Sequence, residues 1–176
     1  MAPLSTVYEA YDVPNFVLTA SQKIAVFRQQ DATGTYTIYG SVWRSGSGWS
    51  ALTTLSSATR NAIGVPVVAK NSTDDVIIVW SALDNSAGIY FIEAVTYSAS
   101  FPGGWGTTTS VTDGTDNPCF GDYRVAIDDS GNIALIWSSV NSSAARSIKE
   151  TSALFSMSPT WNSQTFIASG SGVQVP

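Results

Sequence analysis

The sequence predicts an all-β protein made of three repeated units of about 56 residues. The first marker is a polar turn followed by an apolar run that ends in a large aromatic residue, here called the anchor. The anchors are Phe27, Trp80 and Trp137, which lie 53 and 57 residues apart. A second tryptophan recurs at Trp49, Trp105 and Trp161 with a spacing of 56 residues. Two independent markers with one common period indicate a repeat architecture.

The composition agrees with many short strands joined by tight turns. Aromatic residues make up 11% of the chain and charged residues only 12%, and there are 14 glycines. The formal net charge is −5, and the eight basic residues are scattered, which argues against a nucleic-acid-binding surface. No apolar run has the length of a membrane-spanning helix, so we expect no membrane insertion.

Metal and cofactor chemistry of the common kinds is not indicated. The chain has one cysteine, Cys119, and no histidine, so neither an internal disulfide nor a zinc or iron–sulfur site of the usual ligands is expected. We expect Cys119 to be a small buried hydrophobic residue. The sequence therefore predicts no cofactor and no metal site.

Each unit begins with two predicted strands. The second strand of each unit contains the anchor and is continuously apolar, as expected for a strand that is covered on both faces. The first strands are predicted at 16–20, 67–70 and 124–128, and the second strands at 24–27, 76–80 and 133–137.

Two further strands complete each unit. Segment 144–154 has the propensity of a helix, but its position in the repeat matches 89–97, so a strand is predicted there. Turn sequences rich in Gly, Asn, Asp and Ser separate the strands. The third strands are predicted at 35–43, 88–97 and 144–155, and the fourth strands open with Trp49, Trp105 and Trp161.

Four short antiparallel strands in each repeat are the pattern of a β-propeller blade. The predicted blades are 14–55, 65–111 and 122–168 within a single domain, 1–176. Closed propellers have about 4–8 blades, so three blades leave two open edges. Val175-Pro176 matches Val13-Pro14 and Val65-Pro66, which suggests that the chain stops where a fourth blade would begin. The chain is therefore either part of a longer propeller or half of a six-bladed ring, and we expect a homodimer that closes the ring.

The third unit carries the closest match to a known kind of repeat. Gly131-Asn132-Ile133-Ala134-Leu135-Ile136-Trp137 resembles the repeats of bacterial β-propeller proteins of surface or secreted type. The resemblance covers 14–168, and the first unit departs from it at Gln22-Lys23 and Phe27. It implies a propeller fold and favours a secreted or cell-surface location. The Ser-x-Asp-x-Gly-x-Thr-Trp box of sialidases is absent, which argues against their chemistry.

Candidate ligand-binding residues lie in two kinds of place. Trp43 and Arg44 stand beside Trp49 in a short turn, where an exposed indole next to a cation forms a plausible binding site. Glu93 and Glu150 lie on corresponding third strands and could form polar pockets with Arg28 or Arg146. The bland interpretations are a packed aromatic at the rim for Trp43 and a solvated outer strand for the two glutamates. The recurring aromatics are interpreted as core between blades.

The remaining carboxylates occur around turns, as Asp74-Asp75, Asp113 with Asp116, and Asp122 with Asp128-Asp129. Turn capping explains them better than a calcium site, because no full calcium-loop pattern is present. No catalytic set recurs or converges. We therefore expect a non-catalytic binding or scaffold module with weak carbohydrate recognition. The alternatives are a propeller-fold glycoside hydrolase or sialidase-like enzyme, or a purely structural array of blades in a larger surface protein.

Overall fold

The computed structural model is all-β over the residues that it describes, 15–20, 22–114, 117–140 and 145–170. The side chains of residues 119–121 and 170, and therefore that of Cys119, lie outside this description, as do Val13-Pro14 and Val175-Pro176. The described part contains no helix, and hence none that could cross a membrane. The expected strand at 144–154 is present as β12 (Arg146–Leu154).

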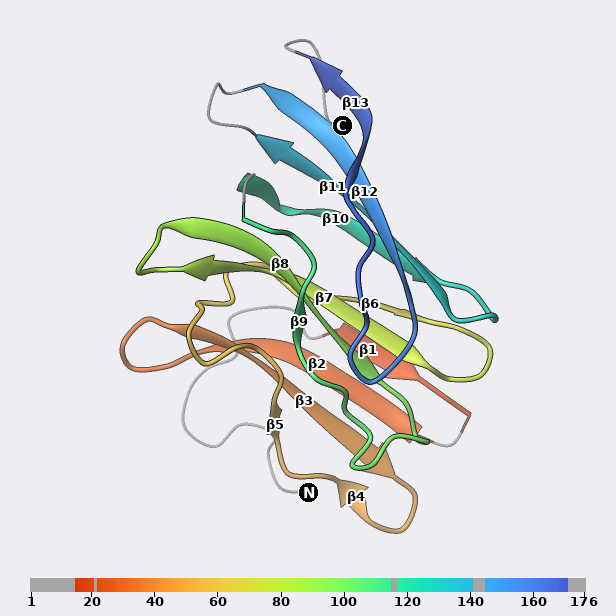
Figure 1. Ribbon diagram of the computed structural model, residues 1–176. Coiled ribbons are helices and arrows are strands. Elements are labelled where there is room, and N and C mark those ends of the chain that lie inside the picture. Colours follow the sequence, from red (N-terminus) through yellow and green to blue (C-terminus); the bar gives the residue numbers. More distant parts are fainter. Residues whose placement is uncertain (1–14, 21, 115–116, 141–144, 171–176) are drawn as a thin grey trace.

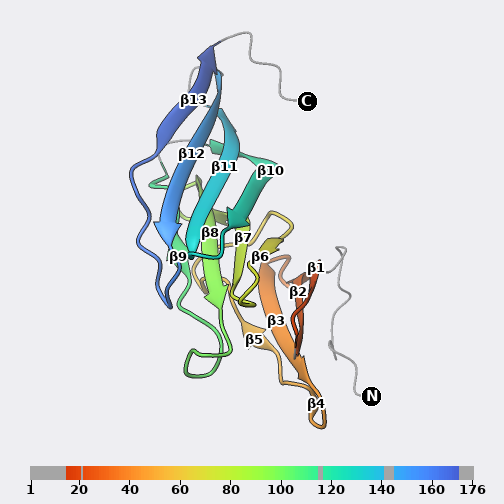
Figure 2. The same ribbon diagram turned by 90° about the vertical axis from the view of Figure 1, so that its right-hand side faces the viewer.

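Three antiparallel sheets follow one another along the chain and are stacked in the same order (Figures 1 and 2). The first sheet contains β1 (Asn15–Leu18), β2 (Gln22–Gln30), β3 (Tyr36–Arg44), β4 (Gly48–Trp49) and β5 (Thr53–Thr54). The second contains β6 (Val67–Lys70), β7 (Val76–Asp84), β8 (Ile89–Tyr97) and β9 (Thr109–Ser110). The third contains β10 (Asn117–Ile127), β11 (Asn132–Val140), β12 and β13 (Thr165–Gly170).

Each sheet is built in chain order, first strand to fourth, as expected for a blade. In the first sheet the fourth strand is split into β4 and β5, which both pair with β3. The first strands β1, β6 and β10 contact one another in sequence, so one edge of each sheet faces the same side of the stack. The stack is open, and no sheet closes on itself.

Two hydrophobic cores hold the sheets together. The middle sheet is buried on both faces, and Val76 to Trp80 are all 0% exposed, which explains why this run is continuously apolar. Alternate residues of β7 serve the two cores, because successive side chains of a strand point to opposite faces. The first core joins Ile24, Val26 and Ile38 to Ile78 and Trp80, and the second joins Ile77, Val79 and Ile92 to Leu135 and Trp137.

The anchors follow a fixed rule in these cores. Trp80 lies in the core shared with the first sheet, and Trp137 in the core shared with the second. Each of these tryptophans therefore faces the preceding sheet. The expectation that the recurring aromatics are inter-sheet core is confirmed for Trp80 and Trp137, and Trp105 and Trp161 pack against the same cores as partly buried residues.

The two outer faces of the stack differ from each other. On the third sheet Ile136 and Leu154 are 43% and 67% exposed. On the first sheet Ala25 and the anchor Phe27 are only 5% and 4% exposed, and the Phe27 ring lies 6.1 Å from that of Tyr39. The expectation of two exposed apolar faces is therefore correct for the third sheet and wrong for the anchor strand of the first.

Candidate functional site

The predicted ligand-binding residues are not gathered in one place. Trp43, Arg44 and Trp49 do come together, because Trp43 pairs with Trp49 and Arg44 with Gly48 across the β3–β4 hairpin. Trp43 is half-buried, and the Lys23 ammonium lies 4.3 Å from the centre of its ring. Glu93 and Glu150 lie in other sheets, so this hairpin is a local cluster without a carboxylate from either strand.

Glu93 is neither solvated nor paired with Arg28 or Arg146, contrary to both interpretations made from the sequence. It is 1% exposed and accepts hydrogen bonds from Trp80 Nε1 and from Arg60 Nη1, each at 3.0 Å. The Arg60 guanidinium lies 3.6 Å from the centre of the Phe91 ring and also donates to Ser110 Oγ at 2.7 Å. Arg60 thus closes the space between the first and second sheets at this position.

The correspondence between Glu93 and Glu150 is also wrong. The register places Glu93 opposite Trp80, whereas the residue opposite Trp137 is Lys149. Glu150 is exposed and pairs with Ile136, one position further along. Its carboxylate accepts a hydrogen bond from Thr165 Oγ1 at 3.0 Å. Lys149 is therefore the structural counterpart of Glu93, with the opposite charge.

A polar groove lies between the second and third sheets, and the sequence did not single it out as a site. Its volume is about 730 Å³, which is within the usual range of ligand pockets. One wall follows β9, the other precedes β13, and Lys149 of β12 contributes between them. The lining consists of Ser110, Val111, Thr112, Asp113, Lys149, Pro159, Thr160, Trp161, Asn162, Ser163 and Gln164.

The walls of this inter-sheet groove are held by hydrogen bonds. Trp161 Nε1 donates to Thr109 Oγ1 at 3.1 Å, which fixes the indole between the sheets. Asn162 Nδ2 donates to Ser152 Oγ at 2.8 Å, and the carbonyl of Asn162 accepts from Thr151 Oγ1 at 2.7 Å. The aromatic wall and the adjacent polar residues are thus fixed from both sheets.

Two opposite charges lie in the same groove. Lys149 is 7% exposed, and its Nζ is 4.7 Å from the centre of the Phe166 ring. Burial lowers the pKa of Lys149, because desolvation disfavours the ammonium, and the nearby charge of Asp113 acts in the opposite direction. The groove therefore combines an indole, hydroxyl and amide groups, and one charge of each sign.

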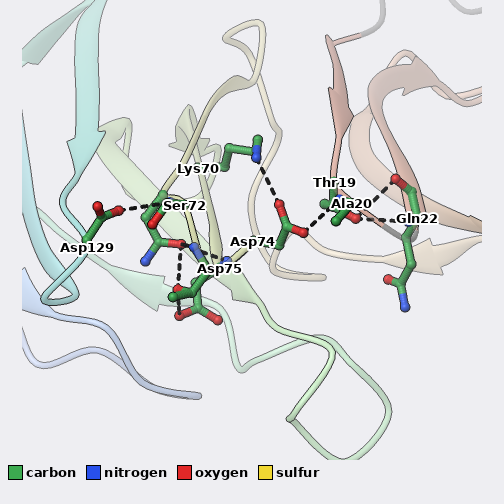
Figure 3. A network of polar contacts seen from close by, with 10 residues as sticks. Thr19, Ala20, Gln22, Lys70, Ser72, Asp74, Asp75 and Asp129 are labelled. Carbon is green, nitrogen blue, oxygen red and sulfur yellow. Dashed lines mark hydrogen bonds and ion pairs between the residues drawn. The ribbon is translucent and has the colours of Figure 1, made fainter.

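The acidic turns serve to connect the sheets (Figure 3). The Asp129 carboxylate accepts from the backbone N–H of Ser72 at 2.9 Å, and that of Asp74 accepts from the N–H of Ala20 at 2.7 Å. Asp74 also forms an ion pair with Lys70 at 2.8 Å. These bonds lower the pKa of Asp74 and of Asp129, because they stabilise the ionised carboxylate. Each turn is thereby attached to the turn of the preceding sheet.

Turn capping is thus supported at the described acidic turns. Asp128 accepts hydrogen bonds from Asn132 and from the backbone of its own turn. No cluster of three or more potential metal ligands occurs among the described residues.

Neither the models of known protein families nor the curated proteins contain a match to this chain.

Proposed function

We propose that the chain is a non-catalytic binding module of β-propeller blades that recognises carbohydrate in the inter-sheet groove. The observation that carries this proposal is the fixed Trp161 indole next to closely spaced hydroxyl, amide and charged groups. A sugar has an apolar face of C–H groups, which packs on an aromatic ring, and an edge of hydroxyl groups, which needs donors and acceptors. The groove supplies both.

The rigidity of the groove also supports binding. Side chains that are already held before the ligand arrives lose less conformational entropy when it binds. Trp161 is held by Thr109, and Asn162 is held by Thr151 and Ser152. A preformed site of this kind suits a small ligand of modest affinity.

The enzyme alternative receives no comparable support. Glycoside hydrolases generally use two carboxyl groups about 5–10 Å apart on either side of the scissile bond. Glu93 belongs to the second sheet and is bound by Arg60 and Trp80, whereas Glu150 is exposed on the third sheet. The groove contains one carboxylate, that of Asp113, among its lining residues.

Titration with a panel of methyl glycosides, followed by calorimetry, tests the proposed function. We expect the wild-type chain to bind at least one glycoside and Trp161→Ala to weaken that binding by about tenfold or more, on the order of the contribution of a stacked aromatic ring. Trp43→Ala is the matched control and is expected to leave the affinity unchanged. If Trp43→Ala abolishes binding while Trp161→Ala does not, the site is the β3–β4 hairpin. Absence of binding to any glycoside would favour a purely structural array.

We further propose that the three sheets are blades of a six-bladed ring that is completed by a second copy. In the first two sheets, Val26 and Val79 pack against the next sheet. Ile136 is at the corresponding place in the third sheet, where it lies beside a hollow of about 270 Å³ lined also by Arg124, Ser138 and Ile148. A fourth blade would cover this face. On the first sheet of a second copy, Tyr39, Trp43 and Trp49 are the partly accessible aromatics that could meet it.

A further inference from the structure

The second and third sheets treat their anchor tryptophans differently. Trp80 Nε1 donates to the carboxylate of its register partner, Glu93. Trp137 has Lys149 as its register partner. Trp137 is 2% exposed, and its Nε1 has no hydrogen-bond partner in the described part of the chain.

The difference follows from the chemistry of the two partners. A carboxylate accepts hydrogen bonds, whereas a lysine ammonium only donates them, so Lys149 cannot replace Glu93 as the acceptor for an indole N–H. A buried donor without an acceptor costs about 1–3 kcal/mol. Such groups are rare in native proteins, and a bound group that supplies the acceptor is one explanation.

The neighbouring groove shows from where an acceptor can come. Trp137 and Lys149 lie directly opposite each other on adjacent strands, and Lys149 lines the inter-sheet groove together with Asp113. In the second sheet the indole N–H reaches the side chain of its register partner at 3.0 Å. A ligand in the groove that contacts Lys149 is thus placed near the unsatisfied N–H of Trp137.

We propose that a hydroxyl group of an uncharged sugar binds at the Trp137–Lys149 pair. The hydroxyl oxygen accepts hydrogen bonds from Trp137 Nε1 and Lys149 Nζ, and the hydroxyl hydrogen is donated to the Asp113 carboxylate. A hydroxyl group has two acceptor sites and one donor, so these three side chains satisfy it completely. This inference rests on the proposed function, because it identifies the ligand class of the same groove.

The charges of the groove favour an uncharged ligand over an acidic one. Asp113 and Lys149 carry opposite charges and lie in the same lining. An added carboxylate, as in a uronic acid, would be attracted by Lys149 but repelled by Asp113, and it has no hydrogen to donate to Asp113. A neutral sugar meets neither conflict.

Calorimetric titration of three chains with the best-binding methyl hexoside and with the corresponding methyl uronide tests the inference. The chains are the wild type, Trp137→Phe and Trp80→Phe. Trp137→Phe removes the N–H donor and keeps an aromatic ring, and we expect it to weaken hexoside binding roughly tenfold, as for the loss of one hydrogen bond. Trp80→Phe is the matched control, because its N–H already binds Glu93, and we expect it to leave the affinity unchanged. The methyl uronide is expected to bind the wild type more weakly than the hexoside.

The possible outcomes separate this inference from the function on which it rests. If hexoside binding is lost in Trp161→Ala but unchanged in Trp137→Phe, the groove binds sugar and the proposed hydroxyl contact is wrong. The same conclusion follows if the uronide binds more tightly than the hexoside. If the wild type binds no hexoside at all, both proposals are wrong. Thermal unfolding of Trp137→Phe, measured in parallel, identifies any loss of binding that is caused by loss of the fold, and Lys149→Met then supplies a second variant of the same contact.

Discussion

Trp80 and Trp137 occupy the same place in consecutive sheets and differ in one hydrogen bond. Both are buried anchors, but only Trp80 has an acceptor among the described residues, the Glu93 carboxylate at 3.0 Å. Glu93 is in turn held by Arg60. The indole of Trp80 is therefore part of a buried polar network, whereas the indole of Trp137 contributes to stability through packing.

We predict that Trp80→Phe destabilises the ligand-free protein more than Trp137→Phe does. Both substitutions remove similar volume from a core, so the difference between them reports the hydrogen bond to a charged group, about 1.5–3 kcal/mol. Urea denaturation of the two variants, without sugar, gives the two free energies of unfolding. Equal losses would show that Trp137 Nε1 has an acceptor in solution, such as an ordered water molecule.

The sequence predicted the recurring aromatics correctly but not the partners of the charged residues. An anchor is visible because its residue type and its spacing recur. The equivalence of Glu93 with Lys149 depends on register, and the sequence spacing alone suggested Glu93 with Glu150 because both belong to third strands. The groove was missed for a related reason. Its residues come from loops of two units, and no single unit carries a recognisable motif.

At the scale of elements, the acidic turns connect each sheet to the preceding one. Asp74 reaches Ala20 from the second sheet, and Asp129 reaches Ser72 from the third. The two carboxylates occupy different positions in their turns, yet each accepts a backbone N–H of the turn before. This function explains why acidic residues accumulate at these turns without forming a metal site in the described structure.

We predict that these links are lost in acid. The folded state lowers the pKa of Asp74 and Asp129 below the ordinary value of 3.8, so the stability that they contribute is present above that value and is lost as the pH falls through the lower, folded pKa. The variant Asp74→Asn/Asp129→Asn should be less stable than the wild type at neutral pH, and the difference should shrink as the pH falls below 3.8. Urea denaturation at a series of pH values measures this.

The control for the acid prediction is Asp75→Asn. Asp75 is adjacent to Asp74 in sequence, and its carboxylate accepts a hydrogen bond from Thr73 of the same turn. We expect this substitution to have a smaller effect at neutral pH, because the connection between the sheets remains. A difference that persists unchanged in acid would show that the two aspartates act through something other than their charge.

The strands were predictable where tertiary position outweighs local preference. Segment 146–154 has residues that favour a helix, yet it forms β12 and pairs with both β11 and β13. The period of the repeat predicted this correctly. The division of the fourth strand of the first sheet into β4 and β5 was not predicted, because it depends on local pairing with β3 rather than on any repeated residue.

At the scale of the whole molecule, the third sheet ends the stack with an apolar face. Ile136 and Leu154 are exposed there, whereas the corresponding faces of the other two sheets are covered by the next sheet. Exposed apolar surface of this kind favours association. The proposed six-bladed ring assigns this face to a second copy.

We predict that the molar mass in solution is that of a dimer and that Ile136→Lys reduces it to that of a monomer. A lysine at the centre of an apolar contact must lose its hydration in the dimer but not in the monomer. Light scattering at several concentrations gives the mass. Thr33→Lys, in an exposed turn of the first sheet, is the control and should remain dimeric. A folded wild-type monomer at micromolar concentration would contradict ring closure by a second copy.

The burial of the middle sheet on both faces also bears on how the chain unfolds. The substantial contacts between sheets in the described part join the first to the second and the second to the third. In such a linear array, stability is the sum of terms for each unit and for each pair of neighbours, so an end unit loses one interface when it opens while a central unit loses two. The outer sheets should therefore open independently of each other, and the amide hydrogens of β7 should be the slowest to exchange with solvent.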